Sequence, residues 1–234
     1  MGSVRYSFFM YRIPSAKNLI VWLGLPLLLI ALWDMTSADL AVSHWYGTSQ
    51  GFALRDNYWL TTILHKGFRR VGVCLAVMCI IAIWWPVGPW RHATRRERVW
   101  LACTVWVCAT GISLLKFTSF TSCPWDLGQF GGSASYVWHF SLGGIDGGPG
   151  GCFPSGHAST FFSFIPVFWL LRRHHARRAW WAFGAMCVAG LALSWVQVMR
   201  GAHFPSHLLW TLWLSWTLGV LASPWLQSPS IPTH

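Results

Sequence analysis

The chain has 234 residues, of which 54% are hydrophobic and only 10% are charged. Soluble domains usually contain about 25% charged residues, so this composition argues against a soluble globule and favours a protein surrounded by lipid. The formal net charge is +11, which would be compatible with binding to nucleic acid. A nucleic-acid surface, however, would interleave basic and aromatic residues on a soluble domain, and the sequence contains no such domain. We therefore expect no nucleic-acid partner.

Long apolar runs alternate with short polar segments along the whole chain. We expect six membrane-spanning helices, most of them about 18 to 20 residues long and able to cross roughly 30 Å of hydrocarbon. The expected spans cover residues 19–37, 71–90, 99–116, 157–171, 179–199 and 207–226. The predicted fold class is all-α, a polytopic six-helix bundle forming one domain over residues 1–234. A cleaved signal peptide is the alternative for the first run, but no small-residue cleavage site stands out.

Basic residues are unevenly distributed between the two sets of connecting segments. If the N-terminus is cytoplasmic, the inner segments carry Arg5, Arg12, Lys17, Arg91, Arg95, Arg96, Arg98, Arg172, Arg173, Arg177 and Arg178, and the outer segments carry Arg55, Lys66, Arg69, Arg70, Lys116 and Arg200. Positive charge holds loops on the cytoplasmic side. We therefore expect an integral protein of a bacterial inner membrane with both termini in the cytoplasm and the outer loops in the periplasm.

Two outer segments have distinctive compositions. Residues 38–70 contain scattered aromatic and basic residues and are expected to lie in the membrane interface. Residues 117–156 are rich in glycine, with Gly131-Gly132, Gly143-Gly144 and Gly147-Gly148. This second segment is long enough to form a lid or mouth over a site.

Several polar residues are expected at the outer ends of the spans. They are Lys116, His157, Arg200, His203 and His207. Pro154-Ser155-Gly156-His157 directly precedes an apolar run, so Ser155 can cap a helix while Gly156 lets the backbone approach a ligand. Free amides and the helix dipole would then point at an anion. An ordinary capped helix start explains these four residues equally well on their own.

The two histidines His157 and His203 supply what phosphate hydrolysis needs. One imidazole can attack phosphorus and the other can protonate the departing oxygen, while Lys116 balances charge on the phosphoryl oxygens. This scheme requires no metal or other cofactor, and the outer loop offers only Asp126 and Asp146 as carboxylates. The adjacent His174 and His175 look like a metal pair, but no further ligands accompany them, so a solvated inner loop is expected.

Three blocks of sequence together resemble the membrane branch of the type 2 phosphatidic acid phosphatase family. They are Lys116 to Cys123-Pro124, Pro154-Ser155-Gly156-His157, and Val196-Gln197 to His203 and His207. The resemblance covers about residues 60–225. It implies that His203 is the nucleophile and forms a phosphohistidine, that His157 is the general acid, and that Lys116, Ser155 and Gly156 hold phosphate oxygens.

The blocks depart from the family pattern at positions that carry charge. Cys123 and Gln197 stand where the family has Arg, and His207 stands where it has Asp. Arg200 is expected to supply the missing cation, with Lys66, Arg69 or Arg70 as alternatives. A neutral His207 could accept a hydrogen bond from His203, and Asp126 or Asp146 could fold over to supply the carboxylate.

Cys123 and Cys152 lie in the same outer loop and flank the first two blocks. An oxidising outer compartment would permit a disulfide between them, which would hold Lys116 near His157; free thiols are the alternative. The other cysteines fall within expected spans, where small apolar packing explains them.

The expected function is hydrolysis of a lipid phosphate or lipid pyrophosphate that reaches an extracytoplasmic site from the bilayer. Isoprenyl pyrophosphate, phosphatidylglycerophosphate, phosphatidate and lipid A phosphate all remain candidates. Two alternatives stay open: a phosphotransferase that passes the phosphoryl group to a second lipid, and a non-catalytic protein that binds or transports anionic lipid.

Overall fold

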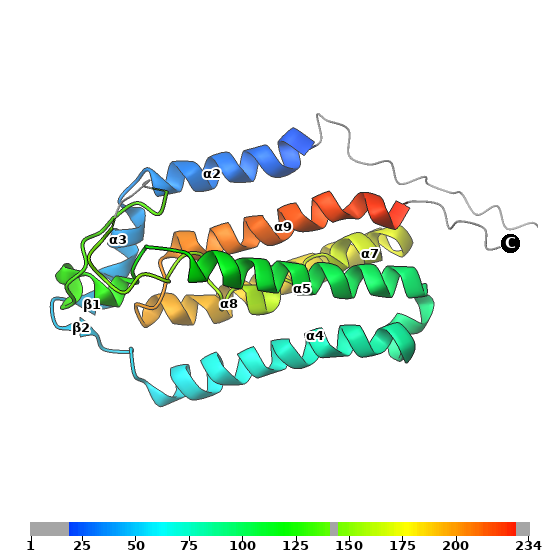
Figure 1. Ribbon diagram of the computed structural model, residues 1–234, viewed down its shortest axis with the longest axis horizontal. Coiled ribbons are helices and arrows are strands. Elements are labelled where there is room, and N and C mark those ends of the chain that lie inside the picture. The colour runs from blue at the N-terminus through cyan, green and yellow to red at the C-terminus, as the bar shows by residue number, and fades with distance from the viewer. Residues whose placement is uncertain (1–18, 141–144, 228–234) are drawn as a thin grey trace, which may run out of the picture.

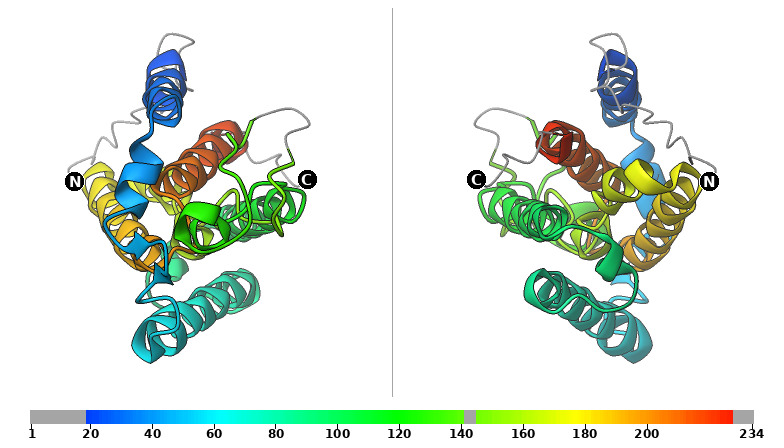
Figure 2. Two further views of the ribbon diagram at one scale, coloured as in Figure 1. Left: turned by 90° about the vertical axis from the view of Figure 1, so that its left-hand side faces the viewer. Right: turned by 90° about the vertical axis from the view of Figure 1, so that its right-hand side faces the viewer.

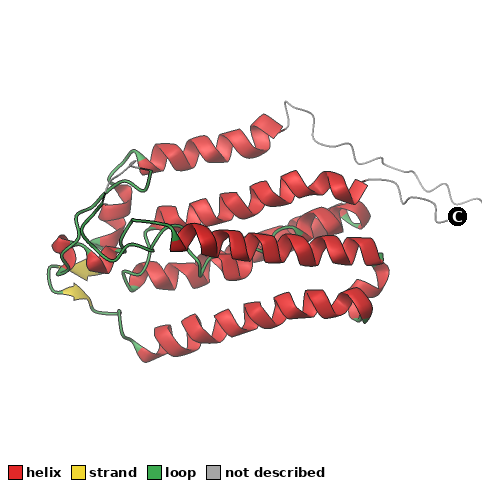
Figure 3. Cartoon of the chain, viewed as in Figure 1, coloured by secondary structure: helices red, strands yellow, loops and turns green. Residues whose placement is uncertain are grey.

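The computed structural model describes residues 19–140 and 145–227. The expected inner residues Arg5, Arg12 and Lys17, the pair Gly143-Gly144 and the two chain ends lie outside the described residues. The described part is mostly helical, with one short hairpin (Figure 3).

The elements follow one another from a first helical segment to a long final helix. In chain order they are η1 (Ile20–Gly24), α2 (Leu25–Asp34), α3 (Ala38–Ser43), β1 (Gly47–Thr48), β2 (Gly51–Phe52), η2 (Trp59–Gly67), α4 (Phe68–Trp84), η3 (Gly88–His92), α5 (Arg95–Phe117), η4 (Pro124–Asp126), η5 (Gly128–Phe130), α6 (Ser159–Phe162), α7 (Val167–His174), α8 (Ala176–Met199) and α9 (Pro205–Gln227). The strands β1 and β2 pair antiparallel, with Gly47 opposite Phe52.

The long helices form a bundle in which most connections lie at two ends. In Figure 1, α2, α4, α5, α8 and α9 extend along a common direction. The end-on views of Figure 2 place α2 and α4 at opposite edges, with α5, α8 and α9 between them. The helix α3, the hairpin and the loop residues 118–140 and 145–158 gather at one end, on the left of Figure 1. We call this the loop end of the bundle.

Local sequence explains where α5 begins. Thr94 caps the helix, because its side chain accepts a hydrogen bond from the Glu97 amide at 3.3 Å while Glu97 accepts one from the Thr94 amide at 2.8 Å. This capping box satisfies amides that a helix start would otherwise leave open. Glu97 also lies 3.5 Å from the guanidinium of Arg173, which ties α5 to α7.

The core is built around the segment that contains α6 and α7. Phe162, Ile165 and Phe168 are all 0% exposed. Pro166 directly precedes α7, and because proline has no amide hydrogen it separates α7 from α6. The ring of Phe162 packs against Gly190 of α8 so closely that a side chain at Gly190 would collide with it.

The expectation of six membrane spans is wrong in number. Among the described residues, three helices are long and apolar enough to cross a membrane, namely Trp59–Trp84, Arg95–Phe117 and Ala176–Met199. The first of these starts well before the expected residue 71, because residues 59–67, predicted to belong to an interfacial segment, continue the helix. These three helices make the chain compatible with a membrane protein.

The other three expected spans fail for different reasons. The apolar helix Ile20–Asp34 belongs to the shorter class of 10–17 residues. The fourth span is divided into α6 and α7, of 4 and 8 residues. The helix α9 has 23 residues, but Ser, Thr and Trp interrupt its leucines and make it less apolar than the three long helices.

Candidate active site

The turn of residues 154–157 lies at the loop end and is fastened to α9. Ser155 is 0% exposed, and its amide donates a hydrogen bond to the carbonyl of His207 at 3.3 Å. Its hydroxyl accepts a hydrogen bond from the amide of Ala158 at 3.3 Å, so Ser155 caps the turn as expected from sequence. The helix that follows, α6, has only 4 residues. The strong dipole expected from a long span at this point is therefore absent, because a macrodipole needs several aligned turns.

Lys116 reaches this turn from the last turn of α5. Its ammonium donates a hydrogen bond to the carbonyl of Gly151 at 2.6 Å. A side-chain carbon on Gly156 would lie 3.3 Å from Cδ of Lys116, which is a tight contact. Gly156 therefore allows the lysine chain to lie directly over the turn, in addition to the backbone access expected from sequence.

The structure brings together the two histidines that the sequence singled out. The ring centres of His157 and His203 are 6.2 Å apart. Nδ1 of His203 lies 3.3 Å from Nδ1 of His207, so the opposite ring nitrogen of His203 is left for a ligand. Nε2 of His157 is buried and has no hydrogen-bond partner among the described residues. A phosphoryl group between the two rings would meet one nitrogen of each.

The protonation state of these rings follows from burial. Burial lowers the pKa of His203 well below its ordinary value of 6.5, and the positive charge of Lys116 lowers it further. Burial, then His65 and Lys116, lower the pKa of His157 to about 3. Both imidazoles are therefore neutral in the empty site at neutral pH, which gives His203 the lone pair that a nucleophile needs.

A cavity of about 370 Å³ begins at Lys116, Gly156 and His157 and continues between α4 and α5, while His203 is buried and is not among the residues that line it. Its polar lining includes Arg69, Lys116 and His157. Farther along the two helices the wall becomes apolar, with Val73, Ala76, Trp106 and Ala109. The cavity can therefore hold a molecule with an anionic head and an apolar tail.

A comparison with known families agrees with this arrangement. The family model of the PAP2 superfamily matches residues 97–230, which is more than half of the chain. The chain belongs to the PAP2 superfamily. Lys116, the turn of residues 154–157 and His203 all lie within the matched range, and the family expected from the three sequence blocks is confirmed. PAP2 proteins are generally hydrolases of the phosphatase type. No curated protein and no solved structure gives a significant match.

Arg200 lies beside the position where the PAP2 pattern has an arginine and this chain has Gln197. Arg200 is 6% exposed and donates hydrogen bonds to the Gln197 side-chain oxygen at 2.9 Å and to the Arg55 carbonyl at 2.8 Å. Its guanidinium also lies 2.9 Å from Nδ1 of His65. Gln197 thus accepts a hydrogen bond from the nearby cation.

His65 is a member of the site that the sequence did not single out. Its ring lies edge-on to His157 with 3.7 Å between the ring centres, and it links His157 to Arg200. The expected interfacial segment contained His65, but nothing in its local sequence separates it from the other polar residues of that segment. Arg69, one of the three alternative cations, lines the cavity.

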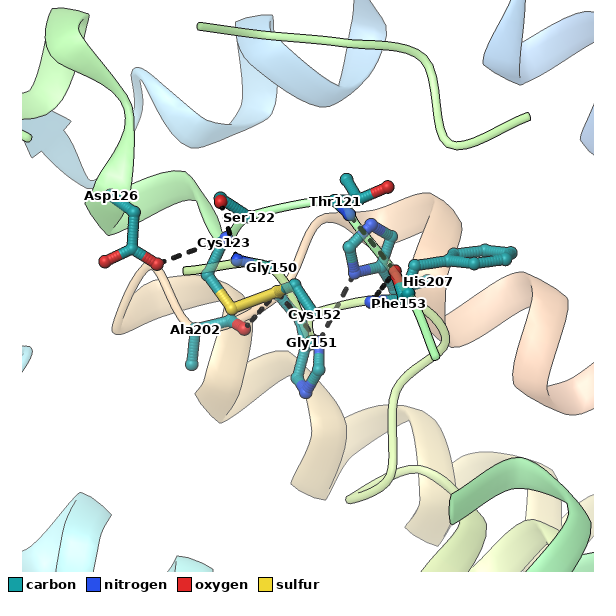
Figure 4. Close-up of a disulfide and its surroundings, with 12 residues drawn as sticks. Thr121, Ser122, Cys123, Asp126, Gly150, Gly151, Cys152, Phe153, Ala202 and His207 are labelled. Atoms are coloured by element: carbon teal, nitrogen blue, oxygen red, sulfur yellow. Dashed lines mark hydrogen bonds between the residues drawn. A yellow bond between two sulfur atoms is a disulfide. The ribbon is translucent and has the colours of Figure 1, made fainter. Parts of the chain in front are cut away.

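The loop that carries the first PAP2 block is closed by a disulfide. The sulfur atoms of Cys123 and Cys152 are 2.09 Å apart. Figure 4 shows the bridge between Cys123 and Cys152. Sγ of Cys152 lies 3.7 Å from Nδ1 of His203, so the bridge packs directly against the candidate nucleophile. The disulfide also fixes the loop segment that contains Gly151, the residue whose carbonyl accepts the hydrogen bond from Lys116.

The two loop carboxylates do not take the place of the PAP2 aspartate. Asp126 accepts a hydrogen bond from the Cys123 amide at 3.3 Å (Figure 4), and burial raises its pKa. Asp146 accepts hydrogen bonds from the amide and hydroxyl of Ser122, at 2.6 and 3.0 Å. These carboxylates hold the loop, so the expectation that one of them folds over His203 is not supported by their contacts.

Two clusters in the described part of the chain have residue types that bind metals. In the first, Cys152 lies with His203 and His207, but its sulfur is already in the disulfide. The second contains Asp34, Asp39 and His139. Its carboxylate oxygens accept hydrogen bonds from indole, hydroxyl and amide groups, so donors already occupy the positions that a cation would take.

Proposed function

We propose that this chain is a lipid phosphate or lipid pyrophosphate phosphatase that works through a phosphohistidine on His203. The observation that carries the proposal is the cavity between α4 and α5. It joins the imidazole of His157 and the ammonium of Lys116 to an apolar wall. A soluble phosphate ester needs no such wall, whereas a lipid phosphate would place its headgroup at His157 and its chains along α4 and α5.

Access from the bilayer fits the position of the cavity. Val73, which lines the cavity on α4, is 53% exposed. Both helices that border the cavity, α4 and α5, belong to segments long and apolar enough to cross a membrane. A lipid could therefore move sideways into the site without leaving the hydrocarbon.

The reaction follows from the two neutral imidazoles. Nε2 of His203 attacks phosphorus, a P–N bond forms, and the P–O bond to the leaving group breaks while His157 donates a proton to the departing oxygen. Because burial lowers the pKa of His157 to about 3, the ring takes up this proton only when the phosphate is bound. The negative charge of the phosphate stabilises the imidazolium. Water then attacks the phosphorus of the phosphohistidine while His157 removes a proton from this water. The P–N bond breaks and phosphate leaves.

Cations and donors around the two rings would stabilise the charge that develops on the phosphoryl oxygens. Lys116 borders the cavity and lies over Gly156. Arg200 supplies a second cation next to Gln197. We assign phosphate binding to Lys116, Ser155, Gly156 and Arg200, with Gln197 holding Arg200 in place.

We further propose that the site faces the extracytoplasmic side of a bacterial inner membrane and that residues 1–234 form one membrane-embedded domain. The opposite end of the bundle carries the clusters of basic residues, which are Arg91, Arg95, Arg96, Arg98, Arg172, Arg173, Arg177 and Arg178 (Figure 1). Such a concentration favours a cytoplasmic position for that end. A disulfide beside His203 also suits an oxidising compartment.

The test is release of inorganic phosphate by purified protein from a panel of lipid phosphates and pyrophosphates in detergent. We expect the wild type to release phosphate, and a His203→Ala variant to release none. The matched control is His92→Ala, because His92 is an exposed histidine of η3 at the opposite end of the bundle. Phosphate that appears only on a second lipid would identify a phosphotransferase. Unchanged turnover in His203→Ala would refute the phosphohistidine, and binding without turnover in the wild type would indicate a lipid-binding protein.

A further inference from the structure

The PAP2 pattern has an aspartate at position 207, and this chain has no carboxylate there. A buried carboxylate nevertheless lies nearby, separated from the nucleophile His203 by two histidine rings. Asp34, at the end of α2, is 3.1 Å from Nε2 of His139 and also accepts a hydrogen bond from the indole of Trp210 at 2.6 Å. The side chains of Asp34 and His139 are each only 1% exposed. The indole contact fixes one carboxylate oxygen and leaves the other for His139.

His139 packs against His207 behind the site. The two ring centres are 5.2 Å apart and the rings are nearly perpendicular. Phe153 holds both rings, because it stacks on His139 at 4.5 Å and meets His207 edge-on at 5.3 Å. The aromatic contacts therefore keep His139, in the loop that precedes α6, beside His207 of α9.

Two ring nitrogens in this contact are buried without a hydrogen-bond partner among the described residues. They are Nδ1 of His139 and Nε2 of His207. Buried polar atoms of this kind are uncommon, and each calls for an explanation. Both atoms belong to rings that are in contact.

The chemistry of the neighbours gives these two nitrogens opposite roles. The carboxylate of Asp34 only accepts, so Nε2 of His139 carries its hydrogen and Nδ1 keeps a lone pair. A nucleophilic Nε2 on His203 requires hydrogen on its Nδ1, which then donates to Nδ1 of His207. His207 must therefore carry its own hydrogen on Nε2. The unpartnered Nε2 of His207 is therefore a donor, and the unpartnered Nδ1 of His139 is an acceptor.

We propose that Asp34 and His139 are positioning residues that support His203 through His207, in place of the missing motif aspartate. The series Asp34, His139, His207 and His203 fixes the tautomer of the nucleophile and stabilises the positive charge that its ring gains when Nε2 bonds to phosphorus. No bond beyond those of the phosphoryl transfer forms or breaks. The role rests on the proposed function, but the tautomer of His203 can be measured without any turnover.

The experiment compares three variants with a matched control. Asp34→Asn removes the charge, His139→Leu removes the acceptor, and His139→Gln keeps an acceptor. Glu97→Gln is the control, because Glu97 is a buried carboxylate at the opposite end of the bundle that accepts a hydrogen bond from the Thr94 amide, which a glutamine can also do. Thermal unfolding of each purified variant establishes that it is folded before activity is measured.

We expect Asp34→Asn and His139→Leu to lower kcat about 10-fold or more at unchanged KM, well short of the ~10⁴-fold cost of losing a directly bonded triad carboxylate. His139→Gln should retain more activity than His139→Leu, and Glu97→Gln should keep the wild-type kcat. In protein with ¹⁵N-labelled histidine, His203 should be a single Nδ1–H tautomer in the wild type and a mixture in His139→Leu.

The two readouts separate this proposal from the proposed function. If kcat and the His203 tautomer in Asp34→Asn and His139→Leu equal those of the Glu97→Gln control, the relay is overturned while hydrolysis by His203 stands. If the wild type has no phosphatase activity but the tautomer of His203 still responds to His139→Leu, the relay stands and the proposed function fails.

Discussion

Arg200 donates a hydrogen bond of 2.9 Å to the side-chain oxygen of Gln197, the residue that stands at a motif position for arginine. The two residues are three positions apart at the end of α8, so their side chains lie on the same face. A guanidinium therefore reaches the neighbourhood of position 197 although the residue there is neutral. This contact makes the role of Arg200 testable by exchanging the two side chains.

Removal of this cation should weaken phosphate binding. We expect Arg200→Ala to lower kcat/KM about 10- to 100-fold, in the range of 1.5–3 kcal/mol for a hydrogen bond to a charged group. The double variant Gln197→Arg with Arg200→Ala should recover part of this loss, because it restores a cation from the motif position. Steady-state kinetics on one lipid phosphate measures both effects. A double variant no better than Arg200→Ala would argue that Arg200 acts only by packing.

The general-acid role of His157 predicts a dependence on the leaving group. His157→Asn should slow hydrolysis of an alkyl phosphate about 10²- to 10⁴-fold, because an alkoxide needs a proton to depart. Hydrolysis of p-nitrophenyl phosphate should slow much less, since its phenolate leaves without one. Rates on the two substrates, with His92→Asn as the control, measure the difference. Equal losses on both substrates would mean that His157 does not donate the proton.

The buried state of His203 predicts how activity and stability respond to acid. Burial and Lys116 hold its pKa well below 6.5, so the ring stays neutral and kcat/KM should persist below that pH. Lys116→Gln removes a positive neighbour and should raise the pKa of His203, so its acid limb should begin at higher pH than in the wild type. The ionisation of the substrate is the same in both measurements, so a difference between the two acid limbs comes from the enzyme. Superimposable acid limbs would contradict the assignment.

The same shift has a consequence for folding. The unfolded chain takes up a proton at an imidazole near pH 6.5, whereas folded His203 does not. Because the unfolded state binds more protons below that pH, the free energy of unfolding should decrease as the pH falls through 6.5. Chemical unfolding of the wild type and of His203→Gln at several pH values measures this contribution, which the variant should lack.

The disulfide should stabilise the folded state and preserve the site. Cys123 and Cys152 are 29 residues apart, and closing a loop of this length is worth about 3.6 kcal/mol in the chain-entropy description. We expect the double variant Cys123→Ser with Cys152→Ser to unfold at lower temperature and to lose activity, because Gly151 would no longer hold Lys116. Cys187→Ser, which changes a half-buried free cysteine of α8, is the control. Equal melting temperatures in the two variants would count against this role.

The cavity between α4 and α5 should select substrates by their chains. Ala109 lines it, whereas Val107 on the same helix does not and is 56% exposed. Ala109→Phe should lower kcat/KM for long-chain lipid phosphates and leave short-chain esters nearly unaffected, because the ring fills the apolar part of the cavity. Val107→Phe is the matched control. A uniform loss on all substrates would place the lipid chains elsewhere.

The sequence motifs predict a candidate site whose residues the structure places at the loop end, whereas the predicted number of spans was wrong. Lys116, the turn of residues 154–157 and His203 are motif residues whose types reflect their chemistry, so they can be recognised without knowledge of packing. The number of spans depends on whether an apolar run continues as one helix. Pro166 interrupts the fourth run, and the Ser, Thr and Trp residues of α9 lower the hydropathy of that helix. The helix expected from residue 71 begins already at Trp59.

The sequence by itself determined the all-α class and the superfamily and predicted His157, His203 and His207 as site residues, since these depend on composition and on spacing along the chain. Only the tertiary structure decided which side chains from distant parts of the sequence meet. Arg200 meets His65 over 135 positions, and Asp34 meets His139 over 105. Neither partner shares a helix face or a motif with the other, so no local period or spacing predicts the pair. Helix packing at the loop end brings them together, because the apolar faces of the helices must be buried and the polar residues at their ends are carried with them.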